Sequence, residues 1–251
     1  GGTTGVGGAV AIFVSTNDVQ AYIGQGAVVE TNGSVAIVAQ NDLILVMLAG
    51  SGAGGGTAGV GSSVGVSTII NSVKAYIGQG AKVTALGNGD AVSFYTGETG
   101  KKKSSGRGLL IAAYSNEDII SMVVGGAGAG SAGVSVTVST NVINTNTNAY
   151  IGIGAIINEN NAGANANQEI RVMAISDTML IGTAIAGAGG GAAGVGGSND
   201  TAVITKTTKA FIDDYANVKA KKNILISARS KDMHVSTTVG GAGGGSAGVG
   251  G

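Results

Sequence analysis

A glycine-rich motif constrains the fold of this chain more than any other feature. Its full copies run from Gly52 to Val60, Gly126 to Val134, Gly187 to Val195 and Gly241 to Val249, and a degenerate trace ending at Val6 opens the sequence. The motif valines are therefore Val6, Val60, Val134, Val195 and Val249. Their spacing of roughly 54 to 74 residues predicts one body built from stacked units, and we expect further repeats of the same chain to stack at both ends.

Two further anchors keep a constant distance from these valines. An aromatic residue follows each of the first four valines at a fixed spacing, within Ala-Tyr-Ile-Gly or a close variant. An apolar-x-apolar-x-Ala segment precedes each later valine at another fixed spacing, as in Val35, Ile37 and Ala39. This alternation is typical of a strand with one buried face. The aromatic anchors are Tyr22, Tyr76, Tyr150 and Phe211, which we interpret as core or corner filling rather than a carbohydrate-stacking platform.

All variation in unit length falls between the second and third anchors. The longest insertion lies there in the second unit and a shorter one in the third, so one turn should accept every insertion. We therefore predict a single solenoid over residues 1–251, with units at about 1–54, 55–128, 129–189 and 190–251 and an inserted loop at about 96–108.

The residues favour an all-β fold. Apolar runs are rich in β-branched residues and interrupted by Asn, Thr and Gly, and none keeps a helical stripe over three turns. The segment from Val10 to Asp18 resembles the one from Val35 to Asp42, which suggests two coils in each repeat unit. We predict a parallel β-solenoid (β-helix) of about nine coils; three shorter coils per unit remain an alternative.

Composition narrows the function classes. The 14 basic and 14 acidic residues cancel, which disfavours nucleic acid as a partner, and the absence of cysteine excludes disulfides and thiolate metal sites. Residues Leu43 to Val73 carry no charge, but their Gly, Ser and Thr content makes a poor helix, so we predict no membrane span in this chain.

Several motifs resemble functional sites without meeting their requirements. Each glycine motif contains G-x-G-x-x-G, as from Gly54 to Gly59, but alternating strand residues follow where a dinucleotide site needs a helix. The glycines fit either corners with positive φ or places where two walls approach closely, and we expect Gly→Val at Gly128 or Gly189 to be far worse than Ser→Ala at Ser131. Gly97 to Ser104 lacks the spacing of a phosphate loop.

No residues form a catalytic constellation. The neighbouring acids Glu117 and Asp118, like Asp213 and Asp214, should point to opposite faces of a strand and cannot flank a glycosidic bond. His234 aligns with Leu45, Ile119 and Leu180, which indicates a partly buried strand position. We predict no enzyme activity, no cofactor and no metal. The candidate partner contacts lie in the long insertion: Lys101, Lys102, Lys103 and Arg107.

The order of motifs resembles the repeats of filamentous adhesins of Gram-negative bacteria, of leukotoxin type, and of related autotransporter passengers. The likeness is carried by Gly-Ala-Gly-Ala-Gly-Ser-Ala-Gly-Val134, by Ala75-Tyr-Ile-Gly-Gln-Gly-Ala81 and by Val35-Ala-Ile-Val-Ala39, and it covers essentially the whole chain. The fourth unit departs from the pattern at Phe211 and Asp213.

The resemblance implies an extracellular, outer-membrane-associated stalk that attaches cells to host cells, other bacteria or matrix through a surface protein or glycan. It brings no catalytic residues. Two alternatives are a carbohydrate-active β-helix enzyme, which needs convergent carboxylates in a cleft, and a self-assembling extracellular filament subunit, which needs its ends paired to other copies.

Overall fold

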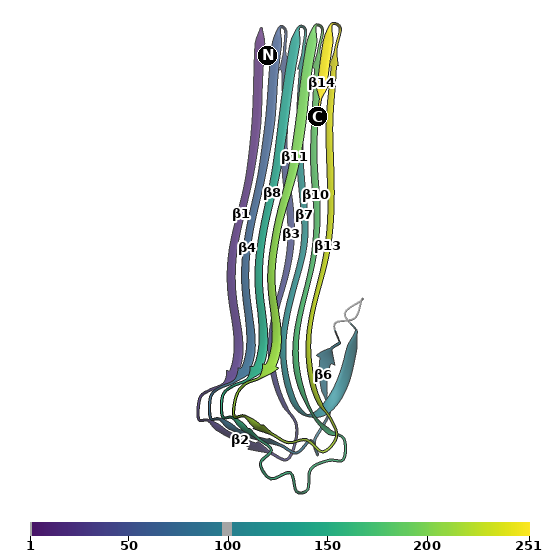
Figure 1. The fold of residues 1–251 in the computed structure, drawn as a ribbon. Coiled ribbons are helices and arrows are strands. Elements are labelled where there is room, and N and C mark those ends of the chain that lie inside the picture. Colours follow the sequence, from purple (N-terminus) through teal and green to yellow (C-terminus); the bar gives the residue numbers. More distant parts are fainter. Residues whose placement is uncertain (1, 97–101) are drawn as a thin grey trace.

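The computed structural model describes residues 2–96 and 102–251, and within them the chain is a parallel β-solenoid. The chain runs down one long strand, crosses a short strand at the base and returns along a second long strand (Figure 1). A tight turn then starts the next coil beside the first. The predicted all-β fold with parallel stacked strands is confirmed.

Three parallel sheets make up the body; each takes one strand from each of four complete coils, and sheet A takes a fifth strand, β14, from the coil that follows. Sheet A contains β1 (Thr4–Ile23), β4 (Ala58–Ile77), β8 (Ala132–Ile151), β11 (Ala193–Ile212) and β14 (Ala247–Gly250). Sheet B, at the base, contains β2 (Val28–Thr31), β5 (Lys82–Ala85), β9 (Ile156–Ile157) and β12 (Asn217–Val218). Sheet C contains β3 (Val35–Gly55), β7 (Lys103–Ala129), β10 (Gln168–Gly190) and β13 (Ile224–Gly244).

The strand register corrects the predicted coil count. Thr4 pairs with Ala58, Ala58 with Ala132, and Ala132 with Ala193, so neighbouring strands are one whole repeat unit apart. The chain thus makes one circuit per unit, and the predictions of two coils per unit, of nine coils in all, and of three shorter coils per unit are wrong. The physical reason is strand length: β1 has 20 residues and β3 has 21, whereas an average strand has about 5 to 6.

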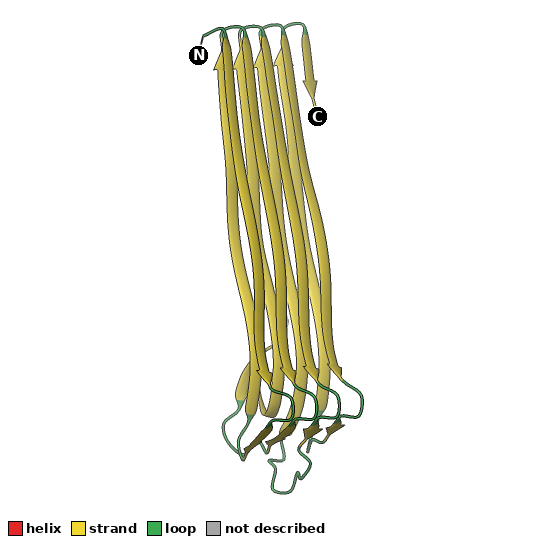
Figure 2. Cartoon of the chain, turned by 90° about the vertical axis from the view of Figure 1, so that its left-hand side faces the viewer, coloured by secondary structure: helices red, strands yellow, loops and turns green. Residues whose placement is uncertain are grey.

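The long strands also change the expected proportions of the molecule. A strand of 20 residues spans about 66 Å, whereas five stacked strands span only about 19 Å from first to last. The two views agree that the described chain is a slab, longest along its strands and thin between sheets A and C (Figures 1 and 2). The half-repeats detected in the sequence are therefore facing strands of one coil, because Val10 lies in sheet A and Val35 in sheet C.

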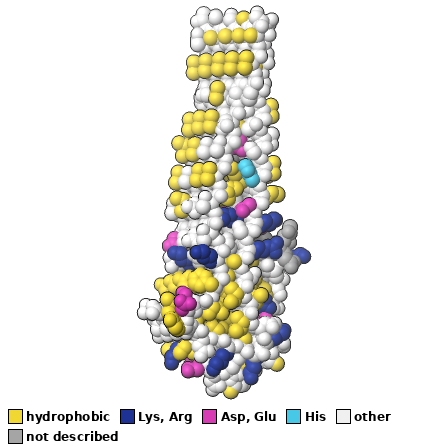
Figure 3. All heavy atoms as spheres, in the orientation of Figure 1, with side chains coloured by type: hydrophobic (Ala, Val, Ile, Leu, Met, Phe, Trp, Pro, Cys, Tyr) yellow, Lys and Arg dark blue, Asp and Glu magenta, His cyan; other side chains and the backbone are white. Residues whose placement is uncertain are grey.

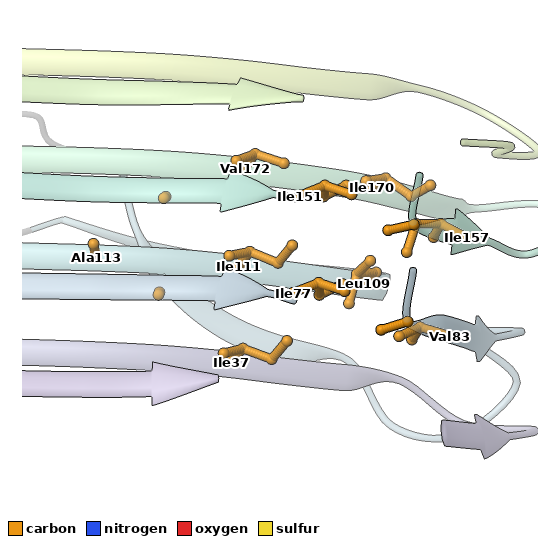
Figure 4. Packing of buried hydrophobic residues seen from close by; sticks show 14 of the residues in the cluster. Ile37, Ile77, Val83, Leu109, Ile111, Ala113, Ile151, Ile157, Ile170 and Val172 are labelled. Carbon is orange, nitrogen blue, oxygen red and sulfur yellow. The ribbon is translucent and has the colours of Figure 1, made fainter. Parts of the chain in front are cut away.

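The main hydrophobic core lies where the three sheets meet near the base (Figure 4). The third anchors bury their alternate side chains there, as predicted, with Ile111 and Val172 fully buried. The cluster is completed by Ile77 and Ile151 from sheet A and by Val83 and Ile157 from sheet B. In the last coil the equivalent Ile226 is 45% exposed, because β13 forms the edge of sheet C.

Farther from the base, the space between sheets A and C holds buried polar side chains such as Ser67 and Asn141 and a small apolar cluster that includes Ile69 and Ile143, and it then narrows. A Cβ built on Gly59 would lie 2.6 Å from the carbonyl oxygen of Gly128 in the strand opposite. Gly26, Gly80 and Gly154 instead adopt positive φ in the bends that follow sheet A. Both roles that the sequence left open for glycine therefore occur, at different positions.

Candidate functional site

The long insertion of the second unit forms a β-hairpin on the outer side of sheet C. β6 (Val92–Tyr95) pairs antiparallel with the beginning of β7, with Val92 opposite Gly106 and Tyr95 opposite Lys103. The predicted loop at 96–108 is therefore wrong over residues 103–108, which are strand. Figure 1 shows β6 beside sheet C near the base of the slab, and its pairing with β7 is the only antiparallel one among the described strands.

A second hydrophobic cluster fixes the hairpin to the slab. Phe94 points from β6 onto side chains that β7 and β10 present on the outer face of sheet C, and it is 4% exposed. Without the hairpin these apolar side chains would face solvent, so the insertion and the scaffold stabilise one another. The buried members of the cluster are Phe94, Leu110, Ala112, Tyr114, Met173 and Ile175.

Tyr114 holds the backbone of β6 through its hydroxyl group. The backbone N–H of Tyr95 donates to this oxygen at 3.0 Å, and the hydroxyl donates to the carbonyl oxygen of Tyr95 at 3.3 Å. The two rings meet edge to face with centroids 5.2 Å apart. Burial of the phenol raises the pKa of Tyr114 to about 12.

Cationic side chains surround the hairpin. The Lys103 ammonium lies 5.0 Å from the centre of the Tyr95 ring, and the Arg171 guanidinium lies 4.6 Å from that of Phe94. Arg171 Nε also donates to Glu169 Oε2 at 2.9 Å. Burial opposes ionisation of Glu169, but its bonds to Arg171, Lys222 and Asn223 outweigh this and lower the pKa of the carboxyl group.

The predicted contact residues have different surroundings. Arg107 donates to the carbonyl oxygens of Gly87 and Gly89, so its guanidinium closes the loop that enters β6. Lys102 and Lys103 lie exposed on the hairpin, and Lys101 lies outside the described residues. The structure thus brings Lys103 to an aromatic surface and gives Arg107 a bonding role within the loop; contact of any of them with a partner stays a prediction.

A hollow of about 200 Å³ lies between the hairpin and the slab. Tyr95 and Tyr114 supply aromatic walls, Lys103 supplies a positive charge, and Gln40 supplies an amide. Such a set can hold a small molecule with an apolar body and a negatively charged or polar substituent. The sequence located the basic residues, but β6 and its aromatic side chains were missed.

The aromatic anchors form a ladder on the outer face of sheet A. Neighbouring rings are stacked at centroid distances of 4.9–5.0 Å and within 7° of parallel. Of the two roles predicted, core or corner filling, the first is wrong, because Tyr22 is 59% exposed while its neighbour Ile23 turns inward toward the core. The rings lie instead at the end of sheet A, beside the bend that follows it. Each stacked ring covers the face of the next, so the ladder presents ring edges to a groove of about 330 Å³ beside it rather than a flat platform.

A buried acid between the sheets was not recognised from the sequence. The Glu117 carboxylate is fully buried and accepts hydrogen bonds from Asn71 Nδ2 at 2.8 Å, Ser115 Oγ at 2.5 Å and Thr178 Oγ1 at 2.8 Å. The alternating pattern that orients Ile119 inward also orients Glu117 inward, so the sequence contained a signal that Glu117 is buried. As predicted, neighbouring Asp118 faces outward, and the two acids cannot act together.

The remaining motifs have structural roles. Each glycine motif forms the turn from sheet C to sheet A and runs into a strand such as β4, not into the helix that a dinucleotide site requires. His234 lies in strand β13 as expected but is exposed rather than partly buried, because β13 is an edge strand. Asp213 and Asp214 lie in the bend after β11 rather than in a strand.

Neither a metal-binding cluster nor a membrane-spanning helix occurs among the described residues. No group of three or more His, Cys, Asp or Glu side chains that could hold a metal ion occurs in the part of the chain that the structure describes. Nor do its residues include a helix with the length and apolarity needed to cross a membrane.

Comparisons with protein-family models, with curated proteins and with solved structures found no match to this chain.

Proposed function

We propose that this chain is a structural and adhesive segment of a bacterial cell-surface fibre. In this proposal the stacked coils form a rigid, extracellular stalk, and the hairpin at β6 and β7 contacts a surface protein or glycan of a host cell, another bacterium or the matrix. The proposal rests on the repeat motifs that resemble filamentous adhesins and on the way the insertions are placed in the fold.

The observation that carries the proposal is the unbroken register of the long strands. Every residue of β1 is paired with one of β4, and every residue of β3 with one of β7, without a bulge or a slip. A force along the stacking direction would load the hydrogen bonds of a whole coil together. This arrangement suits a load-bearing stalk, and the exposed strand edges of β1 and β13 would accept further units of the same kind.

The positions of the insertions support a presenting role. The extra residues of the second unit lie between β5 and β7, and those of the third lie between β9 and β10, so both leave the slab at the corner between sheets B and C. They touch one another there, because Asn88 Nδ2 donates to the carbonyl oxygen of Gly163 at 2.9 Å. Loops on a rigid scaffold are where binding residues are usually found.

The enzyme alternative receives no support from the positions of the acidic pairs described above.

An adhesion assay tests the leading proposal. Beads coated with the purified chain would be presented to host cells, to bacteria and to matrix-coated surfaces, and bound beads counted after a defined shear. We expect adhesion to at least one surface, and a large loss of it when Lys102 and Lys103 are both changed to Glu.

The matched control changes Lys74 and Lys209 to Glu, because both lie on the outer face of sheet A and give the same change of charge. Beads that adhere to none of the surfaces, or that lose adhesion equally with both double variants, would contradict an adhesive role for the hairpin. Circular dichroism would show that each variant keeps its β structure.

A further inference from the structure

The groove beside the aromatic ladder of sheet A repeats the same kinds of residue in successive coils. Its volume of about 330 Å³ lies within the roughly 300–1,000 Å³ of most ligand sites. Each of the first three coils adds a tyrosine, a glycine and a turn residue, so the groove runs across the coils in the stacking direction. The tyrosines are Tyr22, Tyr76 and Tyr150, and the glycines are Gly24, Gly78 and Gly152.

The glycines line the groove with bare backbone. A Cβ on Gly78 would lie 2.6 Å from the backbone nitrogen of Gln25, and a Cβ on Gly152 would lie 2.8 Å from the carbonyl oxygen of Ile77, so the stacking of the coils excludes side chains at both positions. A Cβ on Gly24, in contrast, would meet nothing within 4 Å. The groove is therefore kept open by the scaffold itself and does not depend on how flexible side chains are arranged.

Gln25 and Gln79 give the groove two amide groups in neighbouring coils. Both residues are exposed, and neither side chain has a hydrogen-bond partner among the residues that the structure describes. The hydroxyl groups of Tyr22, Tyr76 and Tyr150 are likewise without a partner in the described part of the chain. Amide and phenol groups can both donate and accept hydrogen bonds. The groove thus offers unused polar groups, repeated from coil to coil, which suit a ligand rich in hydroxyl groups.

The repeat distance of the groove limits which ligands can use these groups in succession. Neighbouring tyrosine rings are 4.9–5.0 Å apart, because in-register strands repeat at about 4.7–4.9 Å. Figure 3 shows the same effect on the surface, where bands of apolar side chains cross the visible face in the stacking direction. A linear ligand that contacts every coil alike must repeat at this distance. The sugars of an extended β-1,4-linked glycan follow one another at nearly this distance, whereas α-1,4-linked chains wind into helices.

Charge restricts the class of glycan further. Asp213, from the fourth coil, is the only charged residue among the described residues that line the groove. Lys74 and Lys209 belong to the neighbouring outward row of sheet A and do not line it. An acidic polysaccharide or a nucleic acid would meet no cation in the groove to neutralise its charges. A neutral chain is therefore the ligand class that fits.

We propose that the groove binds a neutral, extended β-1,4-linked glycan that lies in the stacking direction, with about one sugar beside each coil. The glycan contacts ring edges beside the ladder and does not stack on a platform of ring faces. The three tyrosines span about 10 Å, which is room for about three sugars. Tyrosine loses little conformational entropy on binding, so these rings suit a contact surface. The site lies at the end of sheet A, whereas the hairpin lies on sheet C, so this inference goes beyond the adhesive contact proposed above.

Isothermal titration calorimetry of the purified 251-residue chain with short β-1,4-linked glucose chains tests the proposal. We expect the affinity to rise by roughly tenfold or more from cellobiose to cellotetraose, because the longer chain reaches polar groups in more coils. Maltotetraose contains the same sugars in α-1,4 linkage. It should bind roughly tenfold more weakly than cellotetraose, because its curved chain does not follow the groove.

Two variants change the groove without changing the core. Gly24→Leu fills the groove at the first coil, where an added Cβ meets nothing within 4 Å, and should abolish binding of cellotetraose. Gln79→Ala removes an amide in the second coil and should weaken binding by roughly fivefold, the effect of about one hydrogen bond. The matched controls are Gly197→Leu, which also adds a side chain to open space on sheet A, and Gln20→Ala, which removes an amide from the neighbouring row. Circular dichroism would show that each variant keeps its β structure.

The proposal is overturned if cellotetraose does not bind at millimolar concentration, if maltotetraose binds as tightly, or if cellotetraose binds no better than cellobiose. It is also overturned if either Gly24→Leu or Gln79→Ala leaves binding unchanged, or if the two controls weaken binding as much as they do. The bead assay measures adhesion through Lys102 and Lys103 of the hairpin, so the failure of one proposal is distinguishable from the failure of the other.

Discussion

The backbone of Gly128 in sheet C approaches the inner side of Gly59 in sheet A so closely that Gly59 cannot carry a methyl group. The same contact recurs one coil further on, where a Cβ on Gly133 would run into the carbonyl oxygen of Gly189. In each pair it is the sheet A glycine that cannot be replaced, because the sheet C glycine points outward.

This asymmetry gives a first prediction. Gly59→Ala should lower the free energy of unfolding by about 2 kcal/mol or more, since the methyl group forces the sheets apart. Gly187→Ala should leave stability unchanged or raise it by about 0.5–1 kcal/mol, because alanine restricts the unfolded chain. Urea denaturation of the two variants checks this. Equal effects would show that the sheets do not approach as described.

The stacked rings on sheet A give a second prediction. Tyr150 stacks on Tyr76 at 4.9 Å and on Phe211 at 5.0 Å, so Tyr150→Leu removes two ring pairs and should cost about 1–3 kcal/mol. Tyr22→Leu removes one pair and should cost about half as much. Tyr150→Phe keeps the stack and serves as control. Thermal unfolding of the three variants provides the measurement, and a Phe variant as unstable as the Leu variant would rule out stacking as the cause.

The buried acid gives a third prediction. Glu117→Ala leaves the Asn71 amide and the hydroxyls of Ser115 and Thr178 without their acceptor, so it should lower stability by about 2 kcal/mol or more. Glu117→Gln keeps one acceptor oxygen and should cost less. Asp118→Ala, next in the sequence but facing outward, should change stability by less than about 0.5 kcal/mol. Denaturant midpoints distinguish these; similar values for Glu117→Ala and Asp118→Ala would contradict the buried network.

Tyr114 gives a prediction about pH. Its pKa is raised from 10.0 in the unfolded chain to about 12 in the folded protein, so the unfolded state loses the proton first. The contribution of Tyr114 to stability is therefore complete below pH 10 and is lost as the pH rises through about 12. Tyr114→Phe cannot ionise, so its stability should fall less steeply over this interval than that of the unmodified chain. If the stability of the two proteins fell equally with pH over this interval, the result would argue against a buried phenol at Tyr114.

The sequence was informative about periodicity and less so about the path of the chain. The constant spacing of Val60 to Tyr76 and of Leu109 to Val134 indicated that equivalent side chains stack, and the variable spacing between Tyr76 and Leu109 predicted the corner that accepts insertions. It did not show that Val10 and Val35 lie in facing sheets, since two half-repeats look alike whether they stack or oppose one another. Strands of this length are rare, so a shorter coil was the natural expectation.

Glycine positions show the same limit. The repeated motif indicated that glycine mattered, but not which glycines face inward, and the expectation that Gly128 and Gly189 are the sensitive ones within a single chain conflicts with the open space beside them. The hairpin was hidden for a different reason. The strand from Val92 to Tyr95 is short and lies in a segment without a counterpart in the other units, so no periodicity could mark it.

The corner between sheets B and C has a practical consequence. The second and third units carry extra segments of very different length there, yet the strands on either side keep the same register as those of shorter units. The register of the long strands therefore does not depend on the length of the segment at this corner. Foreign peptides grafted in place of residues 159–166 should leave the scaffold intact, so the solenoid offers a platform for engineering in which one position can be diversified while everything else is held constant.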